Sequence, residues 1–163
     1  MTLCYLALGS NLRVPPRQLR LALHKLSKCP KTMISNCSRL YSSNPLGIRS
    51  QPKYYNMVIE IKTSLHPALL LKHCQRIENE QGRIRKVHWG QRIIDIDILL
   101  YGQSVIHTLE LTIPHPEMLK RDFVLVPLLE IAPTICLPSG EPIAPYLKSC
   151  QSYLSRREPK FGS

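Results

Sequence analysis

Apolar and polar residues recur along the chain at spacings that predict alternating strands and helices. Four segments show the short apolar runs or period-two alternation of β-strands: residues 2–8, 32–43, 54–62 and 93–101. Two helices are predicted, one from Pro15 to Cys29 and one from Pro67 that ends at Gly82. We expect three further elements: a hairpin over residues 105–113, a last helix after Pro116 that ends at about Ile131, and a proline-rich surface tail.

These elements have the order β-α-β-β-α-β, with a hairpin and a helix added at the C-terminal end. That order is typical of the ferredoxin-like, split βαβ core, an α+β fold with an antiparallel sheet. Residues 1–163 have the length of a single domain, in which we expect the tail from about residue 150 to be loosely ordered. The fold alone predicts no function, because many unrelated activities share it.

The alternation in two strands also predicts which side chains share a face of the sheet. In residues 54–62, one face carries Tyr55, Met57, Ile59 and Ile61, and the other carries Tyr54, Asn56, Val58 and Glu60. In residues 93–101, the side chains expected to point into the core are Ile94, Ile96 and Ile98. Asp95 and Asp97 then point together to the opposite face, so two carboxylates lie side by side on one strand.

The chain is strongly basic, which favours an anionic partner. Its 22 Lys and Arg residues against 11 Asp and Glu give a net charge of +11, as suits binding to nucleic acid, a membrane surface or a small phosphorylated molecule. The six cysteines form no C-x-x-C pair and no zinc-finger spacing, so we expect a reduced, cytoplasmic protein rather than a disulfide scaffold. No apolar run approaches the roughly 18 residues of a membrane span, and no signal segment is predicted.

The pair Asp95 and Asp97 is the sharpest candidate site, and it holds two of the three aspartates in the chain. Two carboxylates on one face repel each other unless a cation lies between them. Their hard oxygen atoms suit Mg²⁺, which is commonly held by one or two carboxylates and by substrate phosphates. The alternative is a solvated polar face on an edge strand. We favour the metal site because a basic segment directly precedes the pair.

That basic segment, residues 83–92, contains four Lys or Arg residues, which offer forked donors and point charges to phosphate. Together with the aspartates it predicts a site that clamps a polyphosphate. No Walker A sequence is present, so the chain is not a P-loop enzyme. His115 is held between Pro114 and Pro116, and it could either contact a phosphate or serve as a structural turn residue.

Taken together, these residues resemble the 6-hydroxymethyl-7,8-dihydropterin pyrophosphokinase family of folate synthesis, known from bacteria. The resemblance covers about residues 3–140. It is carried by residues 6–12, 44–47, 51–52, 54, 56, 75–78, 82–83, 89–90, 92, 95–98, 114–116, 118, 121, 123–125, 127–128 and 130–133. Their combined order and spacing are far more specific than any single motif.

The resemblance implies that ATP passes its terminal pyrophosphoryl group to the pterin hydroxymethyl group and leaves as AMP. It implies two Mg²⁺ ions held by Asp95 and Asp97, and catalytic roles for these aspartates together with Arg83 and Arg92. The implied pterin contacts, in which Tyr54 and Phe123 sandwich the ring, are Ser43, Pro45, Leu46, Gly47, Tyr54, Asn56, Trp89 and Phe123. The implied ATP contacts are Gln75, Glu78, Arg85, Trp89, Arg92, Ile98, Thr112, His115 and Arg121. The family precedent is a monomer that binds these small molecules and no nucleic acid.

Some positions depart from common members of that family. Gln91 stands where proline is usual and His88 where arginine is frequent, while Glu110 and Pro116 stand where some relatives have arginine and tyrosine near the nucleotide. Two other hypotheses stay open from the residues: an RNA-binding ferredoxin-like module, and a metal-dependent nuclease that uses the aspartate pair. The RNA-binding hypothesis requires an aromatic RNP1-like run, which the chain lacks.

Overall fold

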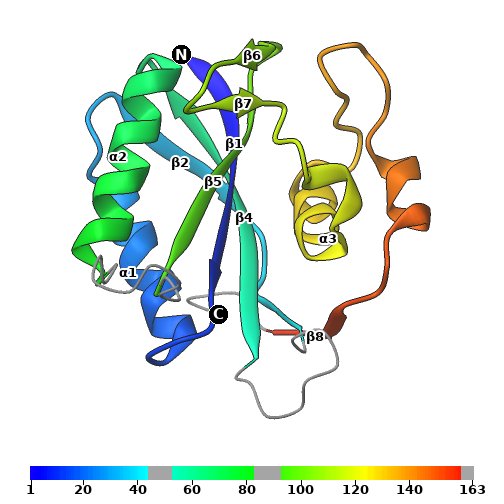
Figure 1. Ribbon diagram of the computed structural model, residues 1–163, viewed down its shortest axis with the longest axis horizontal. Coiled ribbons are helices and arrows are strands. Elements are labelled where there is room, and N and C mark those ends of the chain that lie inside the picture. The colour runs from blue at the N-terminus through cyan, green and yellow to red at the C-terminus, as the bar shows by residue number, and fades with distance from the viewer. Residues whose placement is uncertain (44–52, 83–92, 159–163) are drawn as a thin grey trace.

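The computed structural model describes residues 1–43, 53–82 and 93–158, and its elements follow the predicted order (Figure 1). Within these residues, one six-stranded sheet is built from β1 (Thr2–Ser10), β2 (Thr32–Cys37), β3 (Tyr41–Ser43), β4 (Tyr54–Thr63), β5 (Asp95–Tyr101) and β8 (Leu154–Arg157). A separate hairpin is built from β6 (Ile106–His107) and β7 (Thr112–Ile113). The helices are α1 (Pro15–Ser27), α2 (Pro67–Glu80) and α3 (Asp122–Ile131), with 3₁₀ turns η1 (Met118–Lys120) and η2 (Ala144–Ser149).

The strand order confirms the predicted fold class. The sheet runs β5-β1-β4-β3-β8, and β2 also pairs with β4. Every pairing in this sheet is antiparallel. The strands β1, β2, β4 and β5, joined by α1 and α2, therefore form the ferredoxin-like β-α-β-β-α-β core.

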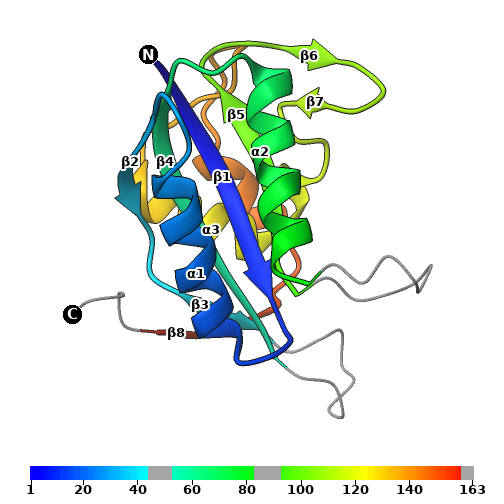
Figure 2. The same ribbon diagram turned by 90° about the vertical axis from the view of Figure 1, so that its left-hand side faces the viewer.

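The sheet is the middle of three layers. Helices α1 and α2 cover one face and α3 covers the other (Figures 1 and 2). The side chains of Leu19 and Leu26 in α1 are fully buried against the first face, where each buried leucine stabilises the fold by roughly 1.5–3 kcal/mol. On the second face, Leu125 and Leu128 of α3 pack with Val58 of β4. The predicted alternation in β4 is confirmed, because Val58 lies in a different apolar cluster from its neighbours along the strand.

The single strand predicted over residues 32–43 is wrong, because the structure divides it into β2 and β3. Between the two strands, the backbone N–H of Arg39 donates to the Glu130 carboxylate, at 3.1 Å and 3.2 Å from its two oxygens. The hydroxyl of Ser38 accepts a hydrogen bond from the backbone N–H of Val58. These contacts replace the regular ladder, because a backbone donor that leaves a strand needs another acceptor.

The continuous helix predicted after Pro116 is also wrong. The chain instead forms η1 and then starts α3 at Asp122, with an extended Arg121 between the two elements. Arg121 makes a parallel bridge to Gln151, and the Asp122 carboxylate accepts two backbone hydrogen bonds from the C-terminal tail. Pairing with a distant part of the chain therefore sets the first residue of α3.

The C-terminal tail contributes β8, which pairs with β3. Tyr41 lies opposite Arg157 and Ser43 lies opposite Leu154. The tail thus adds an edge strand to the sheet beyond the ferredoxin-like core. Among the described residues, no helix is long and apolar enough to cross a membrane.

Candidate active site

Polar side chains gather where β1, β4 and β5 lie side by side at one end of the sheet. Gly9 of β1 pairs with Asn56 of β4 on one side and with Asp95 of β5 on the other. Two residues earlier, Ala7 of β1 pairs with Asp97 of β5. Paired residues and residues two apart share a face, and Ala7 packs against the cluster under α3. Gly9, Asn56, Asp95 and Asp97 therefore face the α3 side, and we call these four residues the polar end of the sheet.

The direction of the two aspartates is fixed by the buried residues that alternate with them. Ile94, Ile96 and Ile98 lie in the core under α1 and α2, each no more than 4% exposed. Asp95 and Asp97 consequently point to the opposite face, as the sequence predicts, and the Asp97 side chain is 46% exposed. Their neighbours across the ladder are Gly9 and Ala7, which have little or no side chain to fill the space over the carboxylates.

A buried carboxylate from α2 supports the strand behind the aspartates. Glu78 is only 4% exposed and accepts a hydrogen bond from the backbone N–H of Ile96 at 3.0 Å. β5 is an edge strand, so this N–H has no neighbouring strand to pair with on that side. Glu78 takes that place and thereby fixes the peptide between Asp95 and Asp97.

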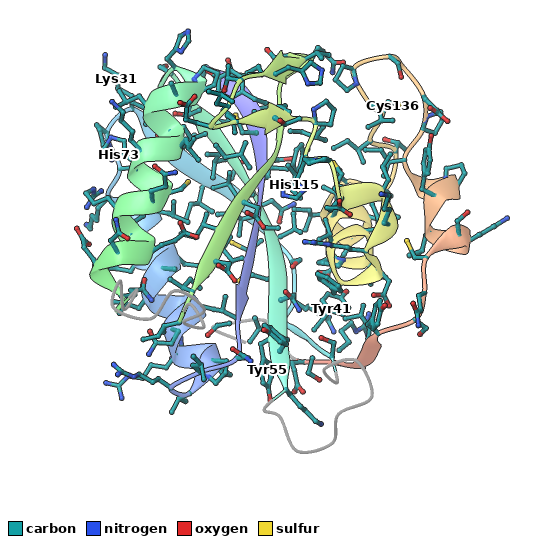
Figure 3. All side chains as sticks on the ribbon, in the orientation of Figure 1. Lys31, Tyr41, Tyr55, His73, His115 and Cys136 are labelled. Carbon is teal, nitrogen blue, oxygen red and sulfur yellow. The ribbon has the colours of Figure 1, made fainter. Side chains whose placement is uncertain are left out.

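His115 approaches the aspartates from the loop that follows β7, on the side of the sheet that faces α3 (Figure 3). Its backbone N–H donates to the Leu99 carbonyl at 3.0 Å, and its Nδ1 accepts from the backbone N–H of Glu117 at 3.1 Å. In the neutral ring the proton is therefore on Nε2, which lies 4.0 Å from Asp97 Oδ2. Burial lowers the pKa of His115, and the negative charge of Asp97 opposes that shift.

Asn56 of β4 pairs with Tyr41 of β3 on one side and with Gly9 of β1 on the other. A methyl group added at Gly9 would come within 2.8 Å of Asn56 Oδ1, so the Asn56 amide lies directly over the glycine. Tyr54 is two residues from Asn56 and shares its face. Burial raises the pKa of Tyr54, and the negative charge of Asp95 raises it further, which places the phenol in the electrostatic field of the aspartates.

Phe123 comes from the first turn of α3, on the same side of the sheet as the polar end. Its ring is partly buried against the α3 cluster. The guanidinium carbon of Arg121 lies 5.7 Å from the ring centroid, and the ring of Tyr153 meets Phe123 edge-on with centroids 6.3 Å apart. Phe123 is thus flanked by a cation from the turn before α3 and by an aromatic ring from the tail.

Several residues predicted for the site lie outside the described residues: Pro45, Leu46, Gly47, Arg83, Arg85, Trp89 and Arg92, with His88 and Gln91. The described residues that flank residues 83–92 are close to each other. A methyl group added at Gly82, whose φ is +102°, would come within 2.7 Å of Ile93 Cδ1. The Ser10 hydroxyl donates to the Ile93 carbonyl. Gly82 and Ile93, the described residues on either side of residues 83–92, therefore lie close together, and Ile93 is two residues before Asp95.

Besides His115 and Arg121, the described residues predicted for the nucleotide lie on α2, β5 and β7, and they differ in how they could contact it. Gln75 is exposed on α2, whereas Glu78 is buried and already binds Ile96. The Ile98 side chain lies in the core, so Ile98 could reach a ligand through its backbone only. Thr112 is half-buried in β7, and Glu110 and Pro116 are both exposed.

Sequence reasoning assigned no role to three residues that position the site. Gly9 makes room for the Asn56 amide, and Ser10 holds Ile93. Glu130 binds the Tyr41 hydroxyl at 2.6 Å, which orients the neighbour of Asn56. Gly9 and Ser10 belong to the motif over residues 6–12 that carries the resemblance, so their position next to the predicted aspartate strand was the available signal. Glu130 likewise belongs to residues 130–133 of the resemblance, but its partners are about 90 residues away, so no local pattern reveals its role.

Comparison with known proteins assigns this chain to a family. A model of 7,8-dihydro-6-hydroxymethylpterin-pyrophosphokinase matches residues 5–133. A 2-amino-4-hydroxy-6-hydroxymethyldihydropteridine pyrophosphokinase of Haemophilus influenzae is 49% identical over 148 residues, covering 91% of this chain and 92% of the relative. The protein of the same name from Pseudomonas aeruginosa is 43% identical over 146 residues, covering 90% of each chain.

Solved structures agree in fold. The HPPK-DHPS of Plasmodium falciparum, in its wild-type crystal structure, superposes with a TM-score of 0.73 at 17% identity. The match covers 91% of this chain and 44% of that chain, so this chain spans less than half of the larger protein. At this identity the likeness shows the fold alone. With the family model and the two bacterial relatives, however, it is clear that the chain belongs to the 7,8-dihydro-6-hydroxymethylpterin-pyrophosphokinase family.

Proposed function

We propose that this chain transfers the pyrophosphoryl group of ATP to the hydroxymethyl group of 6-hydroxymethyl-7,8-dihydropterin, using Mg²⁺ held by Asp95 and Asp97. The products are the pterin pyrophosphate and AMP, and the reaction is a step of folate biosynthesis. The transfer itself follows from membership in the family. The metal and the residue roles are supported by the chemistry of the site, and the count of two Mg²⁺ ions rests on the family resemblance.

The observation that carries the proposal is the placement of Asp95 and Asp97 on one face, opposite Gly9 and Ala7. Among the described residues, no group of three or more His, Cys, Asp or Glu side chains could hold a metal by itself. Two carboxylates are nevertheless what Mg²⁺ uses when substrate phosphates supply the remaining oxygens. When bound, Mg²⁺ would neutralise charge on the triphosphate and help to align it with the hydroxyl group.

The remaining residues support binding and alignment rather than strong base chemistry, as pyrophosphoryl transfer requires. On the pterin side, Tyr54 and Phe123 would enclose the ring, and Asn56 offers a donor and an acceptor to its mixed polar edge. Backbone groups at Ser43 would contact the same edge, together with Pro45, Leu46, Gly47 and Trp89 outside the described residues.

On the phosphate side, His115 would donate from Nε2 to a phosphate oxygen, since its Nδ1 is already engaged by Glu117. Arg121 would add a fixed positive charge. Arg83 and Arg92, with Arg85, would bind the triphosphate from the segment that joins the fold beside Asp95. The chain would act as a cytoplasmic monomer, consistent with the six free thiols found in the described residues.

The RNA-binding hypothesis is less well supported by this fold. In ferredoxin-like RNA-binding modules, bases stack on aromatic residues of the sheet face that carries no helix. Here α3 packs on that face and buries Val58 and Leu100. The nuclease hypothesis uses the same aspartates, so activity assays decide between it and the proposed transfer.

The test is incubation of the purified chain with ATP, Mg²⁺ and the hydroxymethyl dihydropterin, with AMP and pterin pyrophosphate measured by chromatography. The proposal expects both products in equal amounts and none after Mg²⁺ is removed with a chelator.

Asp97→Asn should lower turnover roughly 10²-fold or more, because it removes a charge aimed at the metal. Its melting temperature without ligand should stay the same or rise slightly, because one of two repelling carboxylates is gone. Near-native turnover by Asp97→Asn, or cleavage of DNA in place of transfer, would contradict the proposal.

A further inference from the structure

We propose that Tyr153 is a positioning residue for the reaction, because it holds Phe123 in the orientation that binds the pterin. The proposal rests on the proposed function, in which Phe123 forms one wall of the pterin site. Tyr153 belongs to residues 151–158, which we call the C-terminal segment. The family model matches only as far as residue 133, so this segment lies beyond the region that defines the family.

The contact between the two rings is direct. Tyr153 meets Phe123 with ring centroids 6.3 Å apart and an angle of 66° between the ring planes, an edge-on arrangement. Such pairs favour one relative orientation, since the positive ring edge lies against the negative ring face. The Tyr153 hydroxyl also donates to Gln151 Oε1 at 2.8 Å, which restricts rotation of the Tyr153 ring.

The backbone of the C-terminal segment is fixed by the residue next to Phe123. Asp122 is only 6% exposed, and its Oδ2 accepts hydrogen bonds from the backbone N–H groups of Tyr153 at 2.9 Å and Leu154 at 3.1 Å. Hydrogen bonds to a charged acceptor are among the stronger ones in proteins. The start of α3 and the position of Tyr153 are therefore set by a single carboxylate.

The same segment also reaches the other side of the proposed pterin site. Leu154 lies opposite Ser43, and Arg157 lies opposite Tyr41, in the pairing of β8 with β3. The backbone N–H of Glu158 donates to the Leu40 carbonyl at 2.7 Å. The C-terminal segment thus links Ser43 and Phe123, two residues assigned to the pterin, although they are 80 residues apart in the chain.

The consequence is that Tyr153 would matter for pterin binding without touching the pterin. Loss of its ring would free the Phe123 ring to rotate. Pterin binding would then have to fix the Phe123 ring, and this loss of side-chain entropy would reduce the affinity for the pterin. ATP should be affected less, because its proposed contacts Gln75, Glu78, Ile98 and Thr112 lie on α2, β5 and β7. Arg121, which lies against the Phe123 ring, is the proposed ATP contact that could respond. We expect Tyr153→Ala to weaken pterin binding about two- to tenfold, the range that an aromatic pair can contribute.

The experiment measures pterin binding by calorimetry in the presence of Mg²⁺ and a non-hydrolysable ATP analogue, and measures KM and kcat for both substrates. Tyr153→Ala should raise the Kd and KM for the pterin and leave kcat and the KM for ATP near wild type. Tyr153→Phe should lie close to wild type, because it keeps the ring against Phe123 and loses only the exposed hydrogen bond to Gln151. Tyr146→Ala is the control, since Tyr146 is another C-terminal tyrosine, whose hydroxyl donates to Glu141. Melting temperatures show that each variant is folded.

A double-mutant cycle tests whether Tyr153 acts through Phe123. In a Phe123→Ala background, the added Tyr153→Ala change should have almost no further effect on the pterin Kd. The same fold-loss in both backgrounds, or wild-type pterin binding by folded Tyr153→Ala, would overturn the inference. Failure of the wild-type protein to convert the pterin at all would instead count against the proposed function, so the two failures are distinguishable.

Discussion

At the scale of single residues, the candidate site depends on Gly9, because there is no room for a side chain at this position. Gly9 lies under the Asn56 amide, and a methyl group there would come within 2.8 Å of Asn56 Oδ1. The contact is too short to persist, so the amide must move away from the position proposed to bind the pterin edge. Space over Gly9 is therefore part of the pterin site as much as Asn56 is.

We expect Gly9→Ala to weaken pterin binding several-fold, roughly the effect of losing one or two hydrogen bonds of about 1 kcal/mol each, and to leave binding of an ATP analogue unchanged. Calorimetry with each ligand measures both effects. Adding Gly9→Ala to Asn56→Ala should cost little more than Asn56→Ala alone, because the displaced amide is already absent. Equal losses for ATP and pterin would show that Gly9 supports the fold rather than the pterin site.

A second prediction at this scale concerns Glu78, whose carboxylate binds the Ile96 N–H between the two aspartates. Glu78→Ala leaves that buried donor unpaired, which should lower the free energy of unfolding by roughly 1–3 kcal/mol and also reduce kcat. Glu78→Gln keeps an acceptor and should be milder in both respects. Denaturant unfolding and steady-state kinetics measure the two effects.

The matched control for Glu78 is Glu80→Ala in the same helix. Glu80 pairs on the surface with Arg76 at 2.9 Å and Lys25 at 3.3 Å, and such exposed pairs contribute little to stability. If Glu80→Ala destabilised the protein and reduced kcat as much as Glu78→Ala, the assigned role of Glu78 would be wrong.

At the scale of elements, the spacing of apolar residues predicted those features of the fold that depend on neighbouring residues in the sequence. The alternation in β4 and β5 gave the correct faces for Asn56, Asp95 and Asp97, because a strand buried on one side must repeat every two residues. The break between β2 and β3 was not predictable, since it depends on Glu130 binding Arg39 from 91 residues away. The start of α3 was missed for the same reason, because Asp122 is held by the C-terminal segment.

In the candidate site, too, features that depend on tertiary contacts could not be predicted from the sequence. The aspartate pair and the flanking prolines of His115 are local patterns, so the sequence alone supplied them. The Nε2 proton of His115 follows from a contact with Glu117, and the placement of Tyr153 follows from tertiary pairing. Neither has a period or spacing that a single sequence could reveal.

A prediction at this scale concerns residues 83–92, which lie outside the described residues, between Gly82 and Ile93 in the sequence. We expect Arg83 and Arg92 to contact the triphosphate most strongly in the transition state, where their charges offset the negative charge on the transferred group. Arg92→Ala and Arg83→Ala should lower kcat on the order of 10²–10³-fold and weaken ATP binding much less. Single-turnover kinetics and ATP-analogue titrations separate these effects.

Trp89, the single tryptophan in the sequence, reports on the same segment. Its fluorescence should change when the ATP analogue and the pterin bind together with Mg²⁺. No fluorescence change, combined with wild-type kcat in Arg92→Ala, would mean that residues 83–92 are a solvated basic surface.

At the scale of the whole molecule, the question is what the net charge of +11 serves. A basic surface attracts any polyanion, but such attraction weakens steeply with salt when no specific contacts are made. The sheet face available to RNA in related folds is covered by α3 here. The charge is therefore expected to serve the triphosphate, which would contact positive groups beside the aspartates that we propose to bind Mg²⁺.

We accordingly expect substrates, and not RNA, to stabilise the folded chain at 0.2 M salt. Mg²⁺ with an ATP analogue and the pterin, each at about one hundred times its Kd, should add at least about 2.7 kcal/mol, which corresponds to a rise in Tm of roughly 5–10 °C for a chain of this size. A single-stranded RNA should give a small rise at low salt that disappears at 0.2 M, because counterion release is its main driving force. Thermal unfolding followed by Trp89 fluorescence or calorimetry measures both.

Asp97→Asn is the control variant: it should lose the Mg²⁺-dependent part of the substrate effect and keep the weak response to RNA. A salt-resistant rise with RNA that exceeds the rise with substrates would favour the RNA-binding hypothesis over the proposed transfer.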